Sequence, residues 1–292
     1  MSRQRLKDML VLGINQFREP YYQGVAAQMA FFLFLSVLPM FILLSQLLGL
    51  FSLSLEDLGM WTDLGISGKG IDTLAEMLSY KPSGGNSIFL ALITLWAASK
   101  AHFVLIRVTN YTNTDGQTTG HGYIKERLRS IRTIIVTLFT IVFALVVLVY
   151  GPVILNMIFG RVVGSEIADA AWLALRWPLA FALYFLMISY NYYVLPTRKV
   201  PFRDVVPGSV FASLAFMAVT YFYNLYTGFS SKYNVLYGSF SNIVVLLIWF
   251  WLLSWVMCLG IIINRVWWAT RNNDCKPIAE EAVMRRKPMN IK

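Results

Sequence analysis

Six long apolar runs constrain this chain more than any other feature of its sequence. They cover residues 24–50, 87–109, 131–159, 172–195, 207–230 and 241–264. A membrane-spanning helix needs about 20 mainly apolar residues, because each residue rises about 1.5 Å and the hydrocarbon core is roughly 30 Å thick. Every run is long enough, and none alternates between apolar and polar residues as the strands of a membrane β-barrel do. The sequence therefore predicts an all-α polytopic integral membrane protein with six transmembrane helices.

The composition agrees with a membrane protein and has an unusual charge balance. Of the 292 residues, 57% are hydrophobic and only 14% are charged, whereas soluble domains are about 25% charged. The formal net charge is nevertheless +10, from 25 basic and 15 acidic side chains. Such an excess is found both in proteins that bind nucleic acid and in proteins that contact anionic membranes, so the positions of the charges decide between the two.

The basic side chains gather on alternate connections between the runs. Nineteen of the 25 lie before run one, around the connections from run two to three and from four to five, or after run six. Because cytoplasmic loops are rich in Lys and Arg, both termini are predicted to be cytoplasmic. The charge excess therefore indicates orientation and attraction to anionic lipid headgroups at the cytoplasmic face. No nucleic-acid partner is expected.

The segments outside the runs divide the chain into three parts. Residues 1–23 are predicted to form a cytoplasmic amphipathic lead-in, because apolar residues recur there at helical spacing among basic ones. Residues 24–268 form the six-helix membrane domain, in which about 52–86 predict a small helical external cap between the first two transmembrane helices. Residues 269–292 form a polar, basic cytoplasmic tail.

Lys100 is the most unusual residue, because it lies about 13 residues into run two and hence roughly 20 Å deep. An ionisable side chain at that depth costs several kcal/mol unless it faces protein or a wet cavity. Trp96, Phe103 and Arg107 fall on the same helical face as this lysine. That face predicts a pathway for an anionic or headgroup-bearing ligand. The alternative is that Lys100 extends its four-carbon stem to the inner interface.

Other polar groups and a proline interrupt the runs and extend the candidate pathway. Amides and hydroxyls inside a bilayer most often hydrogen-bond neighbouring helices, with about 0.6 kcal/mol for each bond. A proline frees backbone carbonyls, which is tolerated where neighbours or water satisfy them. Together these groups favour a cavity between helices over an inert anchor. Besides Trp96, Lys100 and Arg107, the candidate pathway residues are Gln28, Ser36, Pro39, Asn191, Asn224, Tyr237 and Asn242.

Catalytic and metal-binding motifs are not evident in the sequence. The chain has two Cys and two His, without the spacing of a zinc site, so neither a metal nor another cofactor is expected. The acids in the predicted cytoplasmic connections are the scattered Asp115, Glu126 and Asp204. Hydrolysis of RNA needs clustered acids, histidines or metal ligands. We therefore expect no enzyme, and no ribonuclease in particular.

Four motifs, near four of the runs, together resemble those of a known family. They are Ser36 and Pro39 in run one, Trp96-Ala-Ala-Ser-Lys100 in run two, residues 195–208 before run five, and a pattern from Tyr233 to Asn264 in run six. Over about residues 15–268 the chain resembles the YihY/virulence factor BrkB family. The resemblance implies a six-helix protein of the bacterial inner membrane. It brings no settled activity, since some members carry a ribonuclease BN label and others are named for virulence.

The sequence favours a transporter of a lipid, an amphiphile or an anionic small solute, which would pass through a cavity between helices. The several spans, the deep Lys100 and the polar groups within the runs support this hypothesis. Membrane lipids are the expected partners, and a homo-oligomer is compatible with the sequence. The alternative is a non-transporting membrane scaffold, whose external cap and basic tail bind other proteins.

Overall fold

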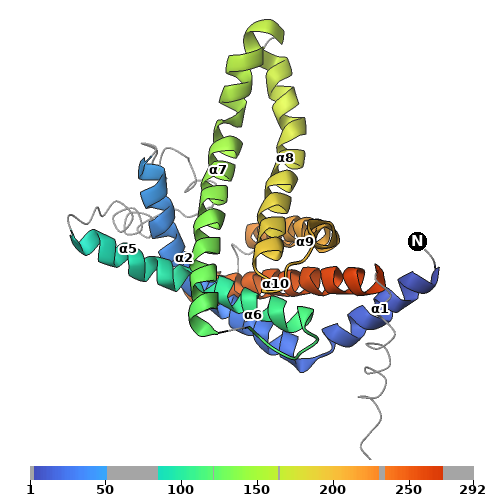
Figure 1. The fold of residues 1–292 in the computed structure, drawn as a ribbon. Coiled ribbons are helices and arrows are strands. Elements are labelled where there is room, and N and C mark those ends of the chain that lie inside the picture. Colours follow the sequence, from blue (N-terminus) through green and yellow to red (C-terminus); the bar gives the residue numbers. More distant parts are fainter. Residues whose placement is uncertain (1–2, 51–84, 121, 164, 230–233, 272–292) are drawn as a thin grey trace, which may run out of the picture. The chain divides into compact units, whose positions relative to one another are not determined.

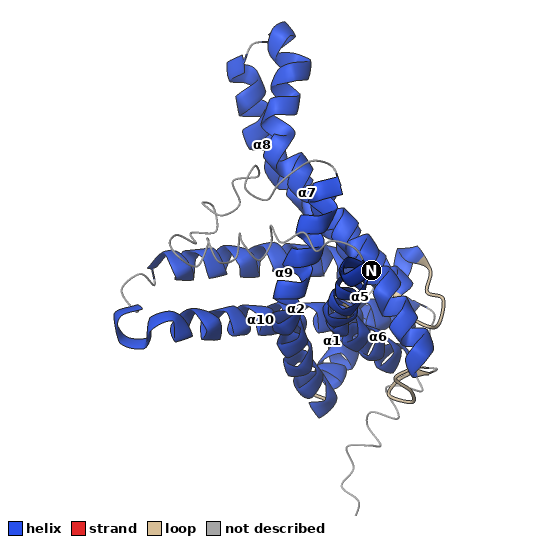
Figure 2. Ribbon diagram, turned by 90° about the vertical axis from the view of Figure 1, so that its left-hand side faces the viewer, coloured by secondary structure: helices blue, strands red, loops and turns tan. Residues whose placement is uncertain are grey.

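A computed structural model of the chain describes residues 3–50, 85–120, 122–163, 165–229 and 234–271. All regular secondary structure in these ranges is helical (Figures 1 and 2). The helices are α1 (Arg3–Phe17), α2 (Pro20–Leu50), α5 (Gly85–Ala98), α6 (Lys100–Asn113), α7 (Tyr123–Val163), α8 (Ser165–Val194), α9 (Phe202–Phe229) and α10 (Asn234–Arg271).

Four helical stretches in the described ranges are long and apolar enough to cross a membrane. They correspond to predicted runs two, four, five and six, and span Leu92–Asn113, Ala170–Val194, Phe202–Tyr226 and Ile243–Arg271.

The other two predicted runs lie within α2 and α7, and part of each of these helices has side chains outside the described set. The count of six spans and the cytoplasmic location of both termini therefore stay predictions. The external cap expected at about 52–86 lies almost entirely outside the described residues, and so does most of the tail 269–292.

Local sequence explains several helix boundaries. Pro20 begins α2, a position where its missing N–H is not needed and its fixed φ fits the helix. After the end of α6, Asp115 and Gly116 have φ values of 50° and 84°, the left-handed conformation that commonly ends helices. Asp204 lies in the first turn of α9, where its negative charge interacts favourably with the positive N-terminal end of the helix dipole.

Predicted run two forms two helices instead of one, because a turn at Ser99 separates α5 from α6. The chain direction continues through the turn, since the Ser99 N–H still donates to the Leu95 carbonyl at 3.0 Å. The carbonyl of Trp96 instead accepts hydrogen bonds from the Ser99 hydroxyl and the Arg127 guanidinium. These side-chain donors supply this carbonyl with partners at the turn, immediately before Lys100.

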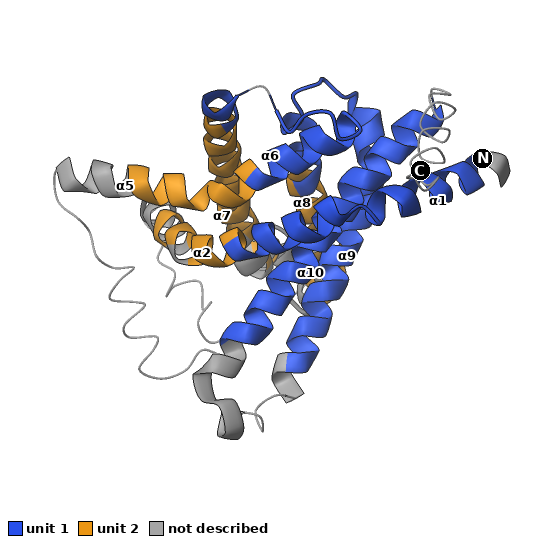
Figure 3. Cartoon of the chain, turned by 90° about the horizontal axis from the view of Figure 1, so that it is seen from below, with its two compact units in different colours: residues 1–31, 104–126, 188–292 blue, residues 32–103, 127–187 orange. Residues whose placement is uncertain are grey.

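The chain folds into two compact units, shown in different colours in Figure 3. Unit 1 contains Met1–Phe31, Val104–Glu126 and Ile188–Lys292, and unit 2 contains Phe32–Phe103 and Arg127–Met187.

In unit 1, α9 and α10 lie side by side (Figures 2 and 3). A Cβ atom at Gly208 would lie 2.0 Å from the carbonyl oxygen of Gly260, and one at Gly260 would lie 2.3 Å from the hydroxyl of Tyr192. That hydroxyl donates to the carbonyl of Met257 at 2.8 Å. Small residues allow this approach of two helix backbones, as is common in membrane proteins.

Helix α1 also packs against α10 in unit 1. The guanidinium of Arg5 lies 4.6 Å from the ring centre of Trp267, and the rings of Phe17 and Trp255 are 4.9 Å apart. Leu6 and Leu10 are left exposed on α1. The role of residues 1–23 as an amphipathic lead-in at the membrane stays a prediction.

In unit 2, side chains from α5 and α7 form an apolar core. Ala98, Ile134 and Leu138 are buried together there. Helices α7 and α8 approach at Gly151, where an added Cβ atom would lie 2.1 Å from the ring of Trp172. Unit 2 is thus packed mainly through apolar side chains.

Candidate functional site

A cavity of about 80 Å³ lies within unit 1. The end of α6, the end of α8, the start of α9 and the last turns of α10 contribute to its wall, together with the connection 195–201. Tyr192 and Ile261 are buried lining residues, whereas Arg198 and Lys199 are exposed at the cavity. The cavity is therefore lined by buried side chains and by two exposed basic ones.

Two asparagine side chains hold the backbone around this cavity. Asn110 accepts a hydrogen bond from the Thr197 N–H at 2.8 Å and donates to the Thr119 carbonyl at 3.2 Å. It therefore ties the connection between α8 and α9 to the loop after α6. Asn264 accepts from the Gly208 N–H at 2.7 Å and ties α10 to α9.

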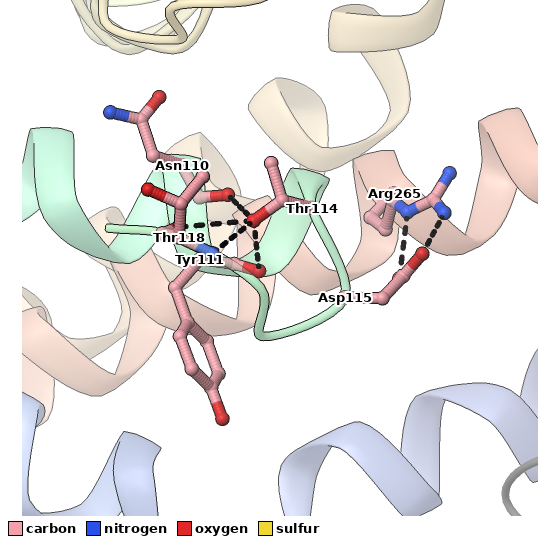
Figure 4. A network of polar contacts seen from close by, with 6 residues as sticks. All are labelled: Asn110, Tyr111, Thr114, Asp115, Thr118 and Arg265. Carbon is pink, nitrogen blue, oxygen red and sulfur yellow. Dashed lines mark hydrogen bonds and ion pairs between the residues drawn. The ribbon is translucent and has the colours of Figure 1, made fainter. Parts of the chain in front are cut away.

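The loop after α6 presents an acid to the cavity wall. The Thr114 hydroxyl donates to the Asn110 carbonyl at 2.8 Å and accepts from the Thr118 N–H at 3.2 Å, which closes the loop (Figure 4). Next to Thr114, Asp115 accepts two hydrogen bonds from the guanidinium of Arg265, at 3.2 and 2.6 Å. Such bidentate pairs fix the orientation of both side chains.

The ring of Trp268 makes cation–π contacts with two arginines at the cavity. Its ring centre lies 4.7 Å from the guanidinium of Arg265 and 5.0 Å from that of Arg198. Among the residues that the structure describes, Arg265 is ion-paired with Asp115, whereas Arg198 and Lys199 form no ion pair. The cavity opening thus carries two positive charges without a described counter-charge.

A second group of cationic side chains lies in unit 2. The ammonium of half-buried Lys100 lies 5.7 Å from the ring centre of Phe32. Arg127 is almost fully buried, and its guanidinium lies 4.0 Å from the ring centre of Trp96 and 5.7 Å from that of Phe103. Trp96 and Phe103 therefore both contact Arg127, although the turn at Ser99 places them in different helices.

The other predicted pathway residues are spread over both units. In unit 2, Ser36 is buried and donates to the Leu33 carbonyl of its own helix at 2.9 Å, and Pro39 lies inside an uninterrupted α2.

Unit 1 contains the remaining six predicted pathway residues. Asn191 is buried, and the exposed members are Gln28, Arg107 and Asn224. Tyr237 and Asn242 lie in α10, but their side chains are outside the described set.

Sequence reasoning missed Arg127 and the unit 1 cavity as candidate sites. The rule for membrane topology already explains Arg127 and the three basic residues of the cavity lining, Arg198, Lys199 and Arg265. One signal was present in the sequence: Asn264, Arg265 and Trp268 recur at spacing i, i+1 and i+4, which places them close together on one helix.

The apolar helices described above are those of a membrane protein. The model of the family described as "Virulence factor BrkB" matches residues 14–283, and the chain belongs to this family.

Three curated relatives illustrate the similarity. YfkH of Bacillus subtilis, named as ribonuclease-like, is 29% identical over 250 residues, which cover 83% of this chain and 88% of YfkH. A UPF0761 membrane protein of Pseudomonas paraeruginosa is 30% identical over 115 residues, 37% of this chain and 27% of that protein. A UPF0761 membrane protein of Alcanivorax borkumensis is 34% identical over 89 residues, 30% of this chain and 20% of that protein. No solved structure matches the chain.

Proposed function

We propose that the protein is a bacterial inner-membrane transporter of a lipid, an amphiphile or an anionic small solute. The observation that carries this proposal is the environment of Lys100. It lies near the middle of the candidate span Leu92–Asn113 and contacts the ring of Phe32. Among the described residues it forms no ion pair. A cation in the middle of a span is costly, and an anionic substrate would supply the missing counter-charge.

The turn beside Lys100 supports the same proposal. Irregular backbone inside a spanning segment is tolerated where protein or water satisfies its polar groups, and interrupted helices are a feature of substrate sites in transporters. Here the Trp96 carbonyl is satisfied by Ser99 and by the Arg127 side chain. Arg127 therefore places a second positive charge at the helix turn that precedes Lys100.

A ribonuclease is less well supported, because the three acids of the predicted cytoplasmic connections, Asp115, Glu126 and Asp204, are either ion-paired or buried. Asp115 is paired with Arg265, and Asp204 with Arg271 at 2.7 Å. Glu126 is also buried. General acid–base catalysis needs a group that reaches the reacting atoms and changes its protonation there. We therefore propose that transport, and not RNA hydrolysis, is the activity of this chain.

The proposal is tested with the purified full-length protein in liposomes. One probe is fluorescent NBD-phosphatidylglycerol, whose movement between leaflets is followed by dithionite quenching, and the other is uptake of radiolabelled inorganic phosphate. We expect wild-type protein to move at least one probe faster than empty liposomes. Lys100→Met, which keeps the apolar stem, is expected to be slower by about tenfold or more, since it loses a desolvated charge contact.

The matched control is Lys125→Met, which removes an exposed lysine at the start of α7. It is expected to transport at the wild-type rate, and Lys100→Arg is expected to retain more activity than Lys100→Met. Transport of neither probe by the wild type, or equal rates for Lys100→Met and the wild type, contradicts the proposal.

A further inference from the structure

We propose that the cavity in unit 1 is a binding site for a phosphate group, carried either by an anionic phospholipid or by free phosphate. All of its lining residues belong to unit 1, whereas Lys100 belongs to unit 2. The inference therefore does not depend on transport. It rests on the charge, the donors, the fixed geometry and the size of the cavity.

The charge at the cavity opening favours an anion. Arg265 is neutralised by Asp115, but Arg198 and Lys199 have no ion-pair partner among the described residues. The planar fork of an arginine matches the oxygens of a phosphate, and a lysine adds a compact positive charge. A phosphate group would therefore find two unneutralised cations at one opening.

The cavity wall also presents a hydrogen-bond donor in a defined orientation. A backbone N–H can only donate, so the atom of Asn264 that faces the Gly208 N–H at 2.7 Å must be the amide oxygen. Asn264 lines the cavity, and its NH₂ group takes no part in the hydrogen bond with Gly208. Asp115 takes two of the five donors of Arg265, so this guanidinium also retains N–H groups.

These groups are held in place without a ligand. The Asn110 side chain binds the N–H of Thr197, immediately before Arg198, and the ring of Trp268 lies under the Arg198 guanidinium. A preorganised site loses less conformational entropy when a ligand binds. The topology rule accounts for basic residues on this connection, but it does not require the contact of Arg198 with Trp268 or that of Thr197 with Asn110.

The size of the cavity admits a small ligand. Its volume of about 80 Å³ is well above the roughly 10–15 Å³ that one water molecule needs on the same measure, so a compact group such as phosphate fits. A phospholipid would bind there through its phosphate.

Calorimetric titration of the purified full-length protein in detergent tests the inference. The probes are sodium phosphate and dihexanoyl-phosphatidylglycerol, and an uncharged short-chain diacylglycerol is the negative control. We compare the double variant Arg198→Gln, Lys199→Gln with the equally charged control Lys7→Gln, Lys125→Gln, whose two lysines are exposed and do not line the cavity.

We expect the wild type and the control to bind at least one phosphate probe, and the cavity variant to bind it about tenfold more weakly or worse. If free phosphate binds and competes with the lipid, the site recognises phosphate itself. If only the lipid binds, the source is a phospholipid headgroup. Binding of neither probe to the wild type, or equal affinities of the two double variants, overturns the inference.

Asn264→Asp provides a second test that keeps the packing of α9 and α10. The carboxylate still accepts from the Gly208 N–H, but it replaces the NH₂ donor by a negative oxygen. We expect a folded protein that has lost phosphate binding. Wild-type affinity in this variant overturns the inference. Lys100→Met is expected to bind phosphate normally, so a failure of this site and a failure of transport are distinguishable.

Discussion

Two buried arginines, one in each unit, are held in different ways. Arg265 in unit 1 is 7% exposed and pairs with the carboxylate of Asp115. Arg127 in unit 2 is 4% exposed, and its described contacts are with the ring and carbonyl of Trp96 and with the ring of Phe103. A bidentate ion pair fixes distance and orientation, whereas the face of an aromatic ring tolerates a lateral shift of the cation.

The close contacts between helices also leave less room for movement in unit 1 than in unit 2. Gly208 in unit 1 faces the backbone carbonyl of Gly260, whereas Gly151 in unit 2 faces the ring of Trp172. A backbone atom cannot move without its helix, but a side chain can adopt another rotamer. The comparison suggests that unit 1 suits a binding site of fixed geometry, and that unit 2 suits a pathway whose lining adjusts to a substrate.

The largest expected effect compares alanine at these two glycines. Gly208→Ala places a methyl group 2.0 Å from the Gly260 oxygen and should lower the free energy of unfolding by about 3 kcal/mol. Gly151→Ala should cost about 1 kcal/mol, because the Trp172 ring can move and alanine is the better helix former. Thermal unfolding in one detergent, followed by tryptophan fluorescence, measures both. Equal changes in the two variants would remove this part of the comparison.

A smaller effect is expected from the ion pair of unit 1. Asp115→Ala leaves the buried Arg265 charge uncompensated, which costs roughly 3–5 kcal/mol in a fully buried pair. Because the Asp115 side chain is 34% exposed, we expect a loss of about 2 kcal/mol in the same unfolding measurement. Asp115→Asn is the matched variant, since asparagine also tolerates the left-handed φ of 50°. If Asp115→Asn is as stable as the wild type, the negative charge is not what holds Arg265.

The apolar runs predicted much of the fold because helices in a membrane are specified by length and hydrophobicity, which are local properties. Runs two, four, five and six correspond to apolar helices of the structure. The turn at Ser99 was not predictable from periodicity. It depends on the Arg127 side chain, which comes from α7 and binds the Trp96 carbonyl.

The candidate sites were only partly predictable. The place of Lys100 within an apolar span follows from run two, whereas its depth in a membrane and the common face of Trp96 and Phe103 stay predictions. The unit 1 cavity does not follow from hydrophobicity or periodicity, because which basic residues become buried or meet Trp268 depends on packing between segments far apart in sequence. Arg198 and Arg265, for example, meet at that ring from positions 67 residues apart.

The smallest expected effect tests how unit 2 holds Arg127. Arg127→Met keeps an apolar side chain and leaves the Trp96 carbonyl with the Ser99 hydroxyl as a donor. We expect the free energy of unfolding to fall by about 1 kcal/mol, because the variant loses the hydrogen bond to the Trp96 carbonyl and the cation–π contacts with Trp96 and Phe103. Arg127→Lys keeps the charge but not the planar fork, so it separates the two contributions. If Arg127→Met is destabilised as much as Asp115→Ala, the aromatic contacts hold an arginine as firmly as the ion pair does, and unit 2 is no more adjustable than unit 1.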